Sequence, residues 1–284
     1  MENINNISPD KQEFLQRTTV IAKPPKSLWY IGKLPKLAPT VAIVGSRKPT
    51  VYGREITLQL SRELAERGVI IVSGLAIGHD ALAAQGALEG GGITVGVVGN
   101  GLANQYPRTT WALREKIIAN GGAVISEYPP DFPVYKGNFL WRNRLISALS
   151  DVVVVVEAGE RSGTLNTAGH AIEQGKELMA VPGNITSPLS IGCNRLIAQG
   201  ATPVLSVDDI FERLGMNITQ TSLISAGNTP AEKLVYKLIR LGISDGDELI
   251  SRSDLAVSDV SMALTMLEIT GSIRPLGANR WAAK

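Results

Sequence analysis

The 284-residue chain has almost none of the residues that build disulfides and metal sites. Cys193 is the single cysteine, so no disulfide can close within the chain and no cysteine cluster can bind a metal. His79 and His170 are its two histidines, which are too few for a zinc site. The chain also lacks a Walker lysine motif, a G-x-S-x-G turn and an acid/base pair with a specific spacing. We therefore expect no metal, no cofactor and no enzymatic activity.

Long hydrophobic runs and a strong excess of charge are missing as well. The apolar stretches are far shorter than the roughly 20 residues that cross a bilayer as a helix. The polar opening MENINNISPDKQEF lacks the apolar core of a secretory signal. The formal net charge is only +2, so a site for a polyanion must come from local clustering of cations. We expect a cytoplasmic protein that does not bind membranes.

Glycine is abundant, at 29 residues, and from Thr40 onward short apolar runs alternate with helical patterns. This order predicts an α/β domain over 19–214, built on a doubly wound parallel sheet with right-handed crossovers. The expected strands are 41–45, 69–73, 93–99, 123–126, 152–157, 178–181 and 203–205. The expected helices are 53–67, 79–89, 108–119, 138–149, 164–174 and 187–199.

The segments on either side of this pattern have a different character. Residues 1–18 are polar and rich in asparagine, which predicts a flexible arm, and 27–32 predicts a short edge strand. Residues 215–229 are polar and without periodicity, as is typical of a linker. Three helical patterns and two short strands follow, which predicts a small winged-helix domain over 230–284.

The winged-helix domain has a balanced charge. Seven basic and seven acidic residues lie within 230–284. A domain without a positive excess is a poor binder of duplex DNA on electrostatic grounds. We therefore favour a protein-contact or accessory role for it over DNA binding.

The segment 136–164, KGNFLWRNRLISALSDVVVVVEAGERSGT, combines most of the chemistry. It begins with an expected flexible basic loop at 136–139 and an Arg-bearing helix from about 138 to 150. Five valines follow, which is typical of a strand covered on both faces. No acid lies between Asp131 and Asp151, and Phe139 and Trp141 place aromatic rings within this basic stretch. Sites for single-stranded nucleic acid combine cations, which contact the phosphates, with aromatic rings, on which the bases stack.

Two turns carry groups suited to a phosphate. Ser162, Gly163 and Thr164 open a helix, where backbone N–H groups face an anion. Gly45 ends a strand and is followed by Ser46 and Arg47, which supply donors. The same residues are also found in a simple helix cap and in a βα turn with a solvated arginine. The residues alone therefore leave open whether these turns bind a phosphate or have only a structural role. We expect a structural role for His79 and a helix-capping role for Asp80.

A series of short, different motifs lies along about 20–205. They are VAIVGSR at 41–47, VSGLA at 72–76, YPR at 106–108, ISEYP at 125–129, GNF at 137–139, RNRLI at 142–146, RSGT at 161–164, AVPG at 180–183 and GCNRLI at 192–197. Together they resemble the DprA/Smf family, DNA-processing protein A, and the C-terminal segment resembles the degenerate winged helix of that family.

The resemblance implies an extended Rossmann-like fold, binding of single-stranded DNA, a homodimer, and delivery of the RecA recombinase onto the strand in natural transformation. The family's DNA-binding positions correspond here to Ser46, Arg47, Lys136, Gly137, Asn138, Phe139, Arg142, Asn143, Arg144, Arg161, Ser162, Gly163, Thr164, Lys176 and Asn194. Helix geometry adds a condition, because Arg142 and Arg144 lie about 200° apart on an ideal helix. We expect only one of them to face the bound DNA strand, unless the helix begins late enough that both arginines lie in its first turn.

The chain departs from the family at several positions near these motifs. The family usually has arginine where Ile77 stands and isoleucine where His79 stands. It often has proline and arginine in place of Leu140 and Trp141. Two family cations are therefore absent, and we expect Trp141 to replace charge by stacking.

Two other functions stay open. The sheet and the Gly-Thr turn also resemble nucleotide phosphoribohydrolases of the lysine-decarboxylase-like group, whose G-G-x-G-T-x-x-E motif carries a catalytic glutamate. Here Thr167 follows Gly163, Thr164, Leu165 and Asn166, so that carboxylate is missing. The remaining alternative is a nucleotide sensor whose winged helix binds duplex DNA, which the balanced charge of that domain disfavours.

Overall fold

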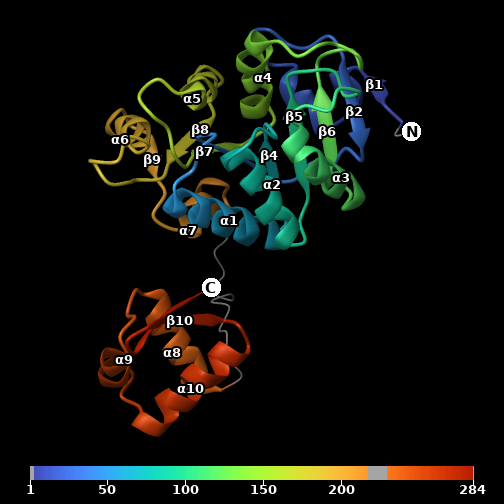
Figure 1. Ribbon diagram of the computed structural model, residues 1–284. Helices are drawn as coiled ribbons and strands as arrows, with labels where there is room; N and C mark the ends of the chain where they lie inside the picture. The colour runs from blue at the N-terminus through green and yellow to red at the C-terminus, as the bar shows by residue number, and fades with distance from the viewer. Residues whose placement is uncertain (1–2, 217–228, 284) are drawn as a thin grey trace. The chain divides into compact units, whose positions relative to one another are not determined.

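The structure is a computed structural model that describes residues 3–216 and 229–283. The chain divides into two compact units, residues 1–217 and 218–284 (Figure 1). Within the described residues, the first unit has a nine-stranded sheet in the order β1-β2-β6-β5-β4-β3-β7-β8-β9. The second has three helices and a hairpin. The expected Rossmann-like α/β fold with a small winged-helix domain is confirmed.

The parallel strands lie close to the positions expected from the short apolar runs. They are β3 (Thr40–Val44), β4 (Ile70–Ser73), β5 (Thr94–Val98), β6 (Ala123–Ser126), β7 (Val152–Val155), β8 (Glu177–Ala180) and β9 (Thr202–Pro203). All of these pair in parallel, and β3 to β7 are buried throughout. Continuous burial explains why these strands lack an apolar–polar alternation.

Helices cover both faces of this sheet (Figure 1). They are α1 (Val51–Glu66), α2 (His79–Glu89), α3 (Trp111–Ala119), α4 (Lys136–Ala148), α5 (Gly163–Glu173), α6 (Ile191–Ala198) and α7 (Val207–Arg213). Val153 and Val155 pack with residues of α4, α5 and α6, whereas Val152 and Val154 pack with α1, α2 and α7. Successive valines of one strand thus serve two separate cores.

The N-terminal segment differs from the expected flexible arm. β1 (Asn5–Ile7) pairs antiparallel with β2 (Leu28–Gly32), and two short 3-10 helices follow it, Pro9–Lys11 and Leu15–Thr18. Phe14 and Leu15 are fully buried in the main core. The Arg17 guanidinium lies 3.1 Å from the carboxylate of Asp151. The prediction of a flexible arm is wrong because two large apolar side chains in this polar segment insert beneath the sheet.

Three further expectations need correction. β2 is not an edge strand, because it pairs with β1 on one side and with β6 on the other. Lys136 to Phe139 are not a flexible loop but the first turn of α4, which Tyr135 precedes in extended conformation. α7 is absent from the expected helices although an acidic N-terminal signature marks it: the Ser206 N–H donates to Asp209 Oδ2 over 2.7 Å.

The second unit has its own small core. It contains α8 (Pro230–Arg240), α9 (Gly246–Ser253), α10 (Val257–Ile269) and the antiparallel strands β10 (Ile273–Gly277) and β11 (Arg280–Ala283). Val235, Leu249 and Leu267 are fully buried at its centre. Most of the expected linker, residues 217–228, lies outside the described residues.

Candidate nucleic-acid interface

The strand order reverses between β3 and β7. The chain runs from β3 through β4 and β5 to β6 on one side, and from β7 through β8 to β9 on the other. The loops that follow β3 and β7 therefore diverge, which opens a crevice at the carboxyl edge of the sheet. A cavity of about 350 Å³ occupies this crevice. Eight of the expected site residues line it: Ser46, Arg47, Phe139, Arg142, Asn143, Ser162, Gly163 and Thr164.

One wall of the cavity is the N-terminus of α5. Ser162 is its N-cap, and the Ser162 hydroxyl oxygen accepts the N–H of Thr164 over 3.1 Å. No acid lies in the first turn, and Gly163 is exposed. The helix dipole and the exposed first turn therefore favour an anion at this point.

The opposite wall is the loop after β3. The Ser46 N–H donates to the carbonyl oxygen of Glu157 over 2.9 Å, which ties this loop to the end of β7. Gly78 has a φ of +88° and supports the loop from below, since a Cβ there would lie 2.4 Å from the Ser46 carbonyl oxygen. Arg47 is exposed, so its guanidinium is available to a ligand in the cavity.

Arg142 lies at the back of the cavity and is buried, at 4% exposure. Its Nη1 donates to the carbonyl oxygen of Gly74 over 2.7 Å and also to that of Val97. Burial lowers the pKa of Arg142 to about 10, so the side chain remains charged at pH 7. Its hydrogen bonds go to the carboxyl ends of two strands. Arg142 therefore contributes positive potential to the cavity while its guanidinium fixes the protein backbone.

Asp80 also lines the cavity, in contrast to the expected helix-capping role. Gly78 is the N-cap of α2, and Asp80 lies within its first turn. Burial raises the pKa of Asp80, although the nearby Arg142 acts to lower it. A Cβ on Gly74 would lie 2.4 Å from the carboxylate and 2.6 Å from the guanidinium, so glycine is needed between them. That glycine is the signal in the sequence that could have located the pair.

A second, smaller cavity of about 80 Å³ adjoins the first, and Arg47, Ala76 and Phe139 line both. Phe139 and Tyr106 lie with ring centroids 5.5 Å apart and ring planes inclined by 39°. Tyr106 is exposed and is not among the expected site residues. The two rings form an aromatic surface beside the cation Arg47, which is the combination that stacks and neutralises single-stranded nucleic acid.

Several expected residues lie near the cavity without lining it. Lys136, Gly137 and Asn138 occupy the first turn of α4, and Lys136 and Gly137 are exposed. Arg161 is exposed in the loop just before Ser162.

Arg144 has a different environment from Arg142. Its Nη2 lies 2.6 Å from Glu127 Oε1, and its guanidinium lies 4.3 Å from the centroid of the Trp141 ring. Lys23 Nζ lies 5.3 Å from the same centroid. As the helix geometry predicts, only one of the two arginines faces the cavity. Trp141 thus contacts protein cations in this structure, and its stacking on a base stays a prediction.

Lys176 and Asn194, two further expected site residues, do not line the cavity. Lys176 immediately precedes β8, so it lies at the amino edge of the parallel sheet. Burial lowers the pKa of Lys176, while the nearby Asp151 acts to raise it and Arg17 to lower it. Asn194 is engaged with the backbone of Gly183, whose N–H it accepts over 3.2 Å and whose carbonyl oxygen it binds over 3.0 Å. The structure therefore places Lys176 on the opposite edge from the cavity and gives Asn194 a loop-fixing contact.

Metal clusters and membrane-spanning helices are both absent from the part of the chain that the structure describes. Residues 3–216 and 229–283 contain no group of three or more His, Cys, Asp or Glu side chains arranged to hold a metal. In the same residues, no helix is both long enough and apolar enough to cross a membrane.

Comparison with known sequences identifies relatives of both units. Residues 5–215 match the family model of DNA recombination-mediator protein A, and residues 225–279 match the DprA winged helix domain. The chain is 38% identical over 215 residues to the DNA processing protein DprA of Bacillus subtilis, a match that covers 75% of this chain and 72% of that protein. It is 44% identical over 191 residues to protein Smf of Escherichia coli, a match that covers 67% of this chain and 51% of that protein.

Two solved structures are similar to the chain. DNA processing protein A from Streptococcus pneumoniae superposes with a TM-score of 0.68 at 35% identity, covering 74% of each chain. The Helicobacter pylori protein, whose structure was described for its unique single-stranded DNA binding mode, superposes with a TM-score of 0.65 at 33% identity. That match covers 75% of this chain and 98% of the other. The chain therefore belongs to the DNA recombination-mediator protein A (DprA) family, whose members are DNA-processing recombination mediators.

Proposed function

We propose that the chain binds single-stranded DNA in the crevice between β3 and β7. In this proposal the phosphates contact the Arg47 guanidinium and the Gly163 N–H, and a base stacks on Phe139 beside Tyr106. The observation that carries the proposal is the common cavity, which brings an exposed arginine, a helix N-terminus without acids and an aromatic ring to one place. The single-stranded DNA binding described for the Helicobacter pylori protein supports this choice of ligand.

The aromatic surface favours a single strand over a duplex. A base can stack on Phe139 only if its own face is free, and in a duplex both faces of each base are covered by neighbouring bases. Phosphate contacts alone would not distinguish the two forms, because they hold the backbone without reading the bases.

The proposal extends to a role in recombination. We infer that the chain acts as a homodimer that protects incoming single-stranded DNA and loads RecA onto it in natural transformation. The support is the family membership and the similarity to the DNA processing proteins of Bacillus subtilis and Streptococcus pneumoniae. Light scattering tests the dimer. Formation of RecA filaments on strands coated with single-strand-binding protein, with and without this chain, tests the loading.

Fluorescence anisotropy with labelled oligo-dT and with a duplex of equal length tests the binding. We expect micromolar or tighter affinity for oligo-dT and clearly weaker affinity for the duplex. The logarithm of the affinity should fall by about 0.7 per logarithm of salt concentration for each phosphate contacted. Equal affinity for both forms, or none for either, would contradict the proposal.

The alternative of a nucleotide phosphoribohydrolase depends on a carboxylate that this chain lacks. Thr167 stands where that group has its glutamate, and it is buried in the cavity wall. Among the described residues that line the cavity, Asp80 is the only acid, and it lies beside Arg142. Release of base or ribose phosphate from nucleoside monophosphates is the assay that would favour the enzyme.

A further inference from the structure

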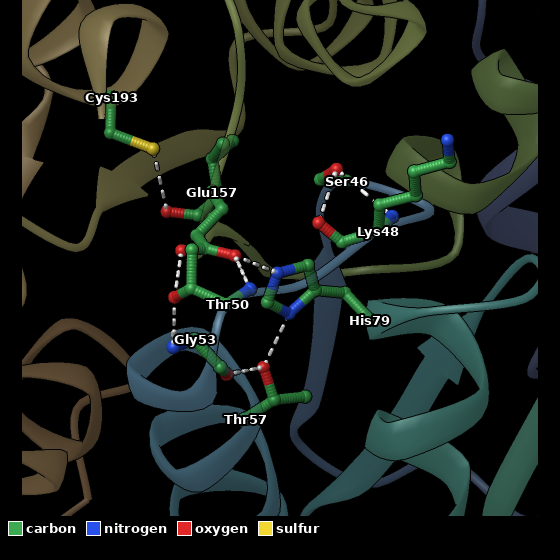
Figure 2. Close-up of polar contacts among 9 residues, drawn as sticks. Ser46, Lys48, Thr50, Gly53, Thr57, His79, Glu157 and Cys193 are labelled. Atoms are coloured by element: carbon green, nitrogen blue, oxygen red, sulfur yellow. Dashed lines mark hydrogen bonds and ion pairs between the residues drawn. The ribbon is translucent and has the colours of Figure 1, made fainter. Parts of the chain in front are cut away.

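A buried histidine lies behind the Ser46–Arg47 loop and has no part in the function proposed so far. His79, the first residue of α2, is fully buried. Its Nδ1 lies 2.6 Å from Thr57 Oγ1 on α1, and its Nε2 lies 3.0 Å from Glu157 Oε2 (Figure 2). A Cβ on Gly45 would lie 2.4 Å from the imidazole ring, so the ring packs directly beneath the end of β3.

Glu157 is buried as well and accepts three hydrogen bonds. Its Oε1 accepts the Thr50 hydroxyl over 2.6 Å, and its Oε2 accepts the Thr50 N–H over 2.9 Å in addition to the contact with His79. The same Thr50 hydroxyl oxygen caps α1 by accepting the Gly53 N–H over 3.0 Å (Figure 2). Three donors compensate a carboxylate that is only 3% exposed.

His79 and Glu157 together hold both ends of the loop that carries Arg47. At one end, the backbone N–H of Ser46 donates to the backbone carbonyl oxygen of Glu157 over 2.9 Å. The backbone carbonyl oxygen of Ser46 accepts the backbone N–H of His79 over 3.3 Å. At the other end, Thr50 is bound to the Glu157 carboxylate. The position of Arg47 between these ends is therefore set by two residues that do not reach the cavity.

The hydrogen bonds fit two protonation states of His79. In the neutral state, Nε2–H donates to Glu157 and Nδ1 accepts the Thr57 hydroxyl. In the protonated state both nitrogens donate, and the Thr57 hydroxyl can turn to the Gly53 carbonyl oxygen, 2.7 Å away. The heavy atoms need not move, but the charge behind the loop changes from −1 to zero for the His79–Glu157 pair.

Burial has the largest effect on the ring and lowers the pKa of His79 below its ordinary value of 6.5. Of the charged groups, Glu157 at the end of β7 raises this pKa and Arg54 on α1 lowers it. Asp80, the next residue of α2, lies in the cavity wall together with Arg47. The neutral imidazole is therefore the main form at pH 7, and it does not compensate the negative charge of Glu157. This charge lies behind the loop that binds a phosphate in the proposed function.

We propose that His79 and Glu157 are positioning residues for Arg47, and that protonation of His79 strengthens the binding of single-stranded DNA by removing the negative charge behind the Arg47 loop. The inference rests on the proposed function, since it concerns the same cavity. By linkage, a bound phosphate favours the imidazolium and raises the pKa of His79. The affinity gain is present at low pH and disappears as the pH rises through the pKa of His79.

A double-mutant cycle with Arg47 tests the positioning role. His79→Leu removes the donor to Glu157, and we expect oligo-dT affinity at pH 7.5 to fall about two- to tenfold, the range that one net hydrogen bond corresponds to. His79→Gln keeps a donor at this position and should restore most of that loss. In an Arg47→Ala background, His79→Leu should have little further effect. Equal losses in both backgrounds would show a general structural effect and overturn the positioning role.

A pH series tests the charge effect. The ratio of wild-type to His79→Gln affinity for oligo-dT should rise as the pH falls from 7.5 to 5.5, while His170→Gln serves as the matched histidine control with a flat ratio. Taking ratios cancels the titration of Asp80, which all variants share. Imidazole NMR is readily assigned with two histidines in the chain, and the His79 pKa should increase when oligo-dT is added.

The outcomes separate the two proposals. If the wild type fails to bind oligo-dT, the proposed function fails and this inference fails with it. If the wild type binds but the affinity ratio is flat and the His79 pKa is unchanged by DNA, the charge effect alone is wrong and the DNA-binding proposal stands. A rising ratio together with a DNA-induced increase in the pKa supports the inference.

Discussion

The Ser46 N–H donates to the carbonyl oxygen of Glu157 over 2.9 Å, and this bond helps to join the ends of two strands that are adjacent in the sheet but over 100 residues apart in the chain. Beyond it, the loop of Ser46 and the loop of Glu157 diverge to the two walls of the cavity. The site is thus a direct consequence of strand order, since a cavity opens where the crossover direction reverses.

Arg47→Ala should weaken single-stranded DNA binding for all sequences alike. Removal of a charge-assisted phosphate contact costs about 1.5–3 kcal/mol, or roughly ten- to a hundredfold in affinity. The salt dependence should become shallower by about 0.7 for each phosphate that the variant no longer binds. Anisotropy titrations with oligo-dT, oligo-dC and a mixed sequence measure both quantities, and a weakening confined to one sequence would contradict a phosphate role.

Lys176→Ala is the matched control for that experiment. It also removes one positive charge, but from the amino edge of the sheet, where Lys176 precedes β8. We expect affinity to change by less than about twofold, in contrast to what the family resemblance alone implies. A loss as large as that of Arg47→Ala would mean that the strand crosses both edges of the sheet.

Phe139→Leu should weaken binding by removing a stacking surface. A base stacked on an aromatic ring is worth about 1–3 kcal/mol. The salt dependence should stay unchanged, because no phosphate contact is removed. Tyr106→Leu, which removes the neighbouring ring 5.5 Å away, should give a smaller loss in the same direction. An altered salt slope for Phe139→Leu would indicate a disturbed backbone path and would argue against stacking.

The strands and the fold class were predictable because β-branched runs buried on both faces look alike in any parallel sheet. The N-terminal segment was not, because its composition is polar and its anchoring depends on Phe14 and Leu15, whose partners are distant in sequence. A prediction from composition uses the average polarity of the N-terminal segment. The structure of that segment instead depends on the burial of two side chains and on its pairing with β2.

The candidate site was predictable in part for a similar reason. Glycine turns located the carboxyl edge correctly, and eight expected residues line one cavity. Arg144 is directed away by Glu127, an acid 17 positions upstream that no local pattern connects to it. The place of Lys176 away from the cavity could have been predicted from the sequence, because a residue that precedes a parallel strand lies at the opposite edge from residues that follow one.

Gly53→Ala should destabilise the first unit. A Cβ at this position would lie 2.4 Å from the Glu157 carboxylate, which three hydrogen bonds hold in place. Overpacking of this kind costs about 1–3 kcal/mol, which lowers the melting temperature by several degrees in a unit of this size. Gly169→Ala in α5 is the control: nothing lies within 4 Å of its Cβ, and replacing a helical glycine should stabilise. Calorimetry that shows equal melting temperatures for both variants would refute the packing argument.

Arg142→Met should destabilise the protein in a pH-dependent manner. Asp80 already has a pKa raised by burial, and removal of the neighbouring cation raises it further. A group whose folded-state pKa is raised stabilises the fold below its unfolded pKa and loses this contribution as the pH rises through its folded pKa. The decrease in stability should therefore be larger at pH 7 than at pH 4.5, as measured by chemical denaturation.

The double variant Arg142→Met, Asp80→Asn checks the cause of that decrease. With the carboxylate replaced by a neutral amide, the added pH dependence should disappear, although the hydrogen bonds to Gly74 and Val97 are still missing. A pH dependence that persists in the double variant would assign it to another group.

A crystal structure of the chain with bound oligo-dT tests the binding of DNA between β3 and β7 most directly. We expect a phosphate within hydrogen-bond distance of the Arg47 guanidinium and the Gly163 N–H, with a base against the ring of Phe139. An ordered strand bound elsewhere on the protein, with the cavity between β3 and β7 free of DNA, would contradict this expectation.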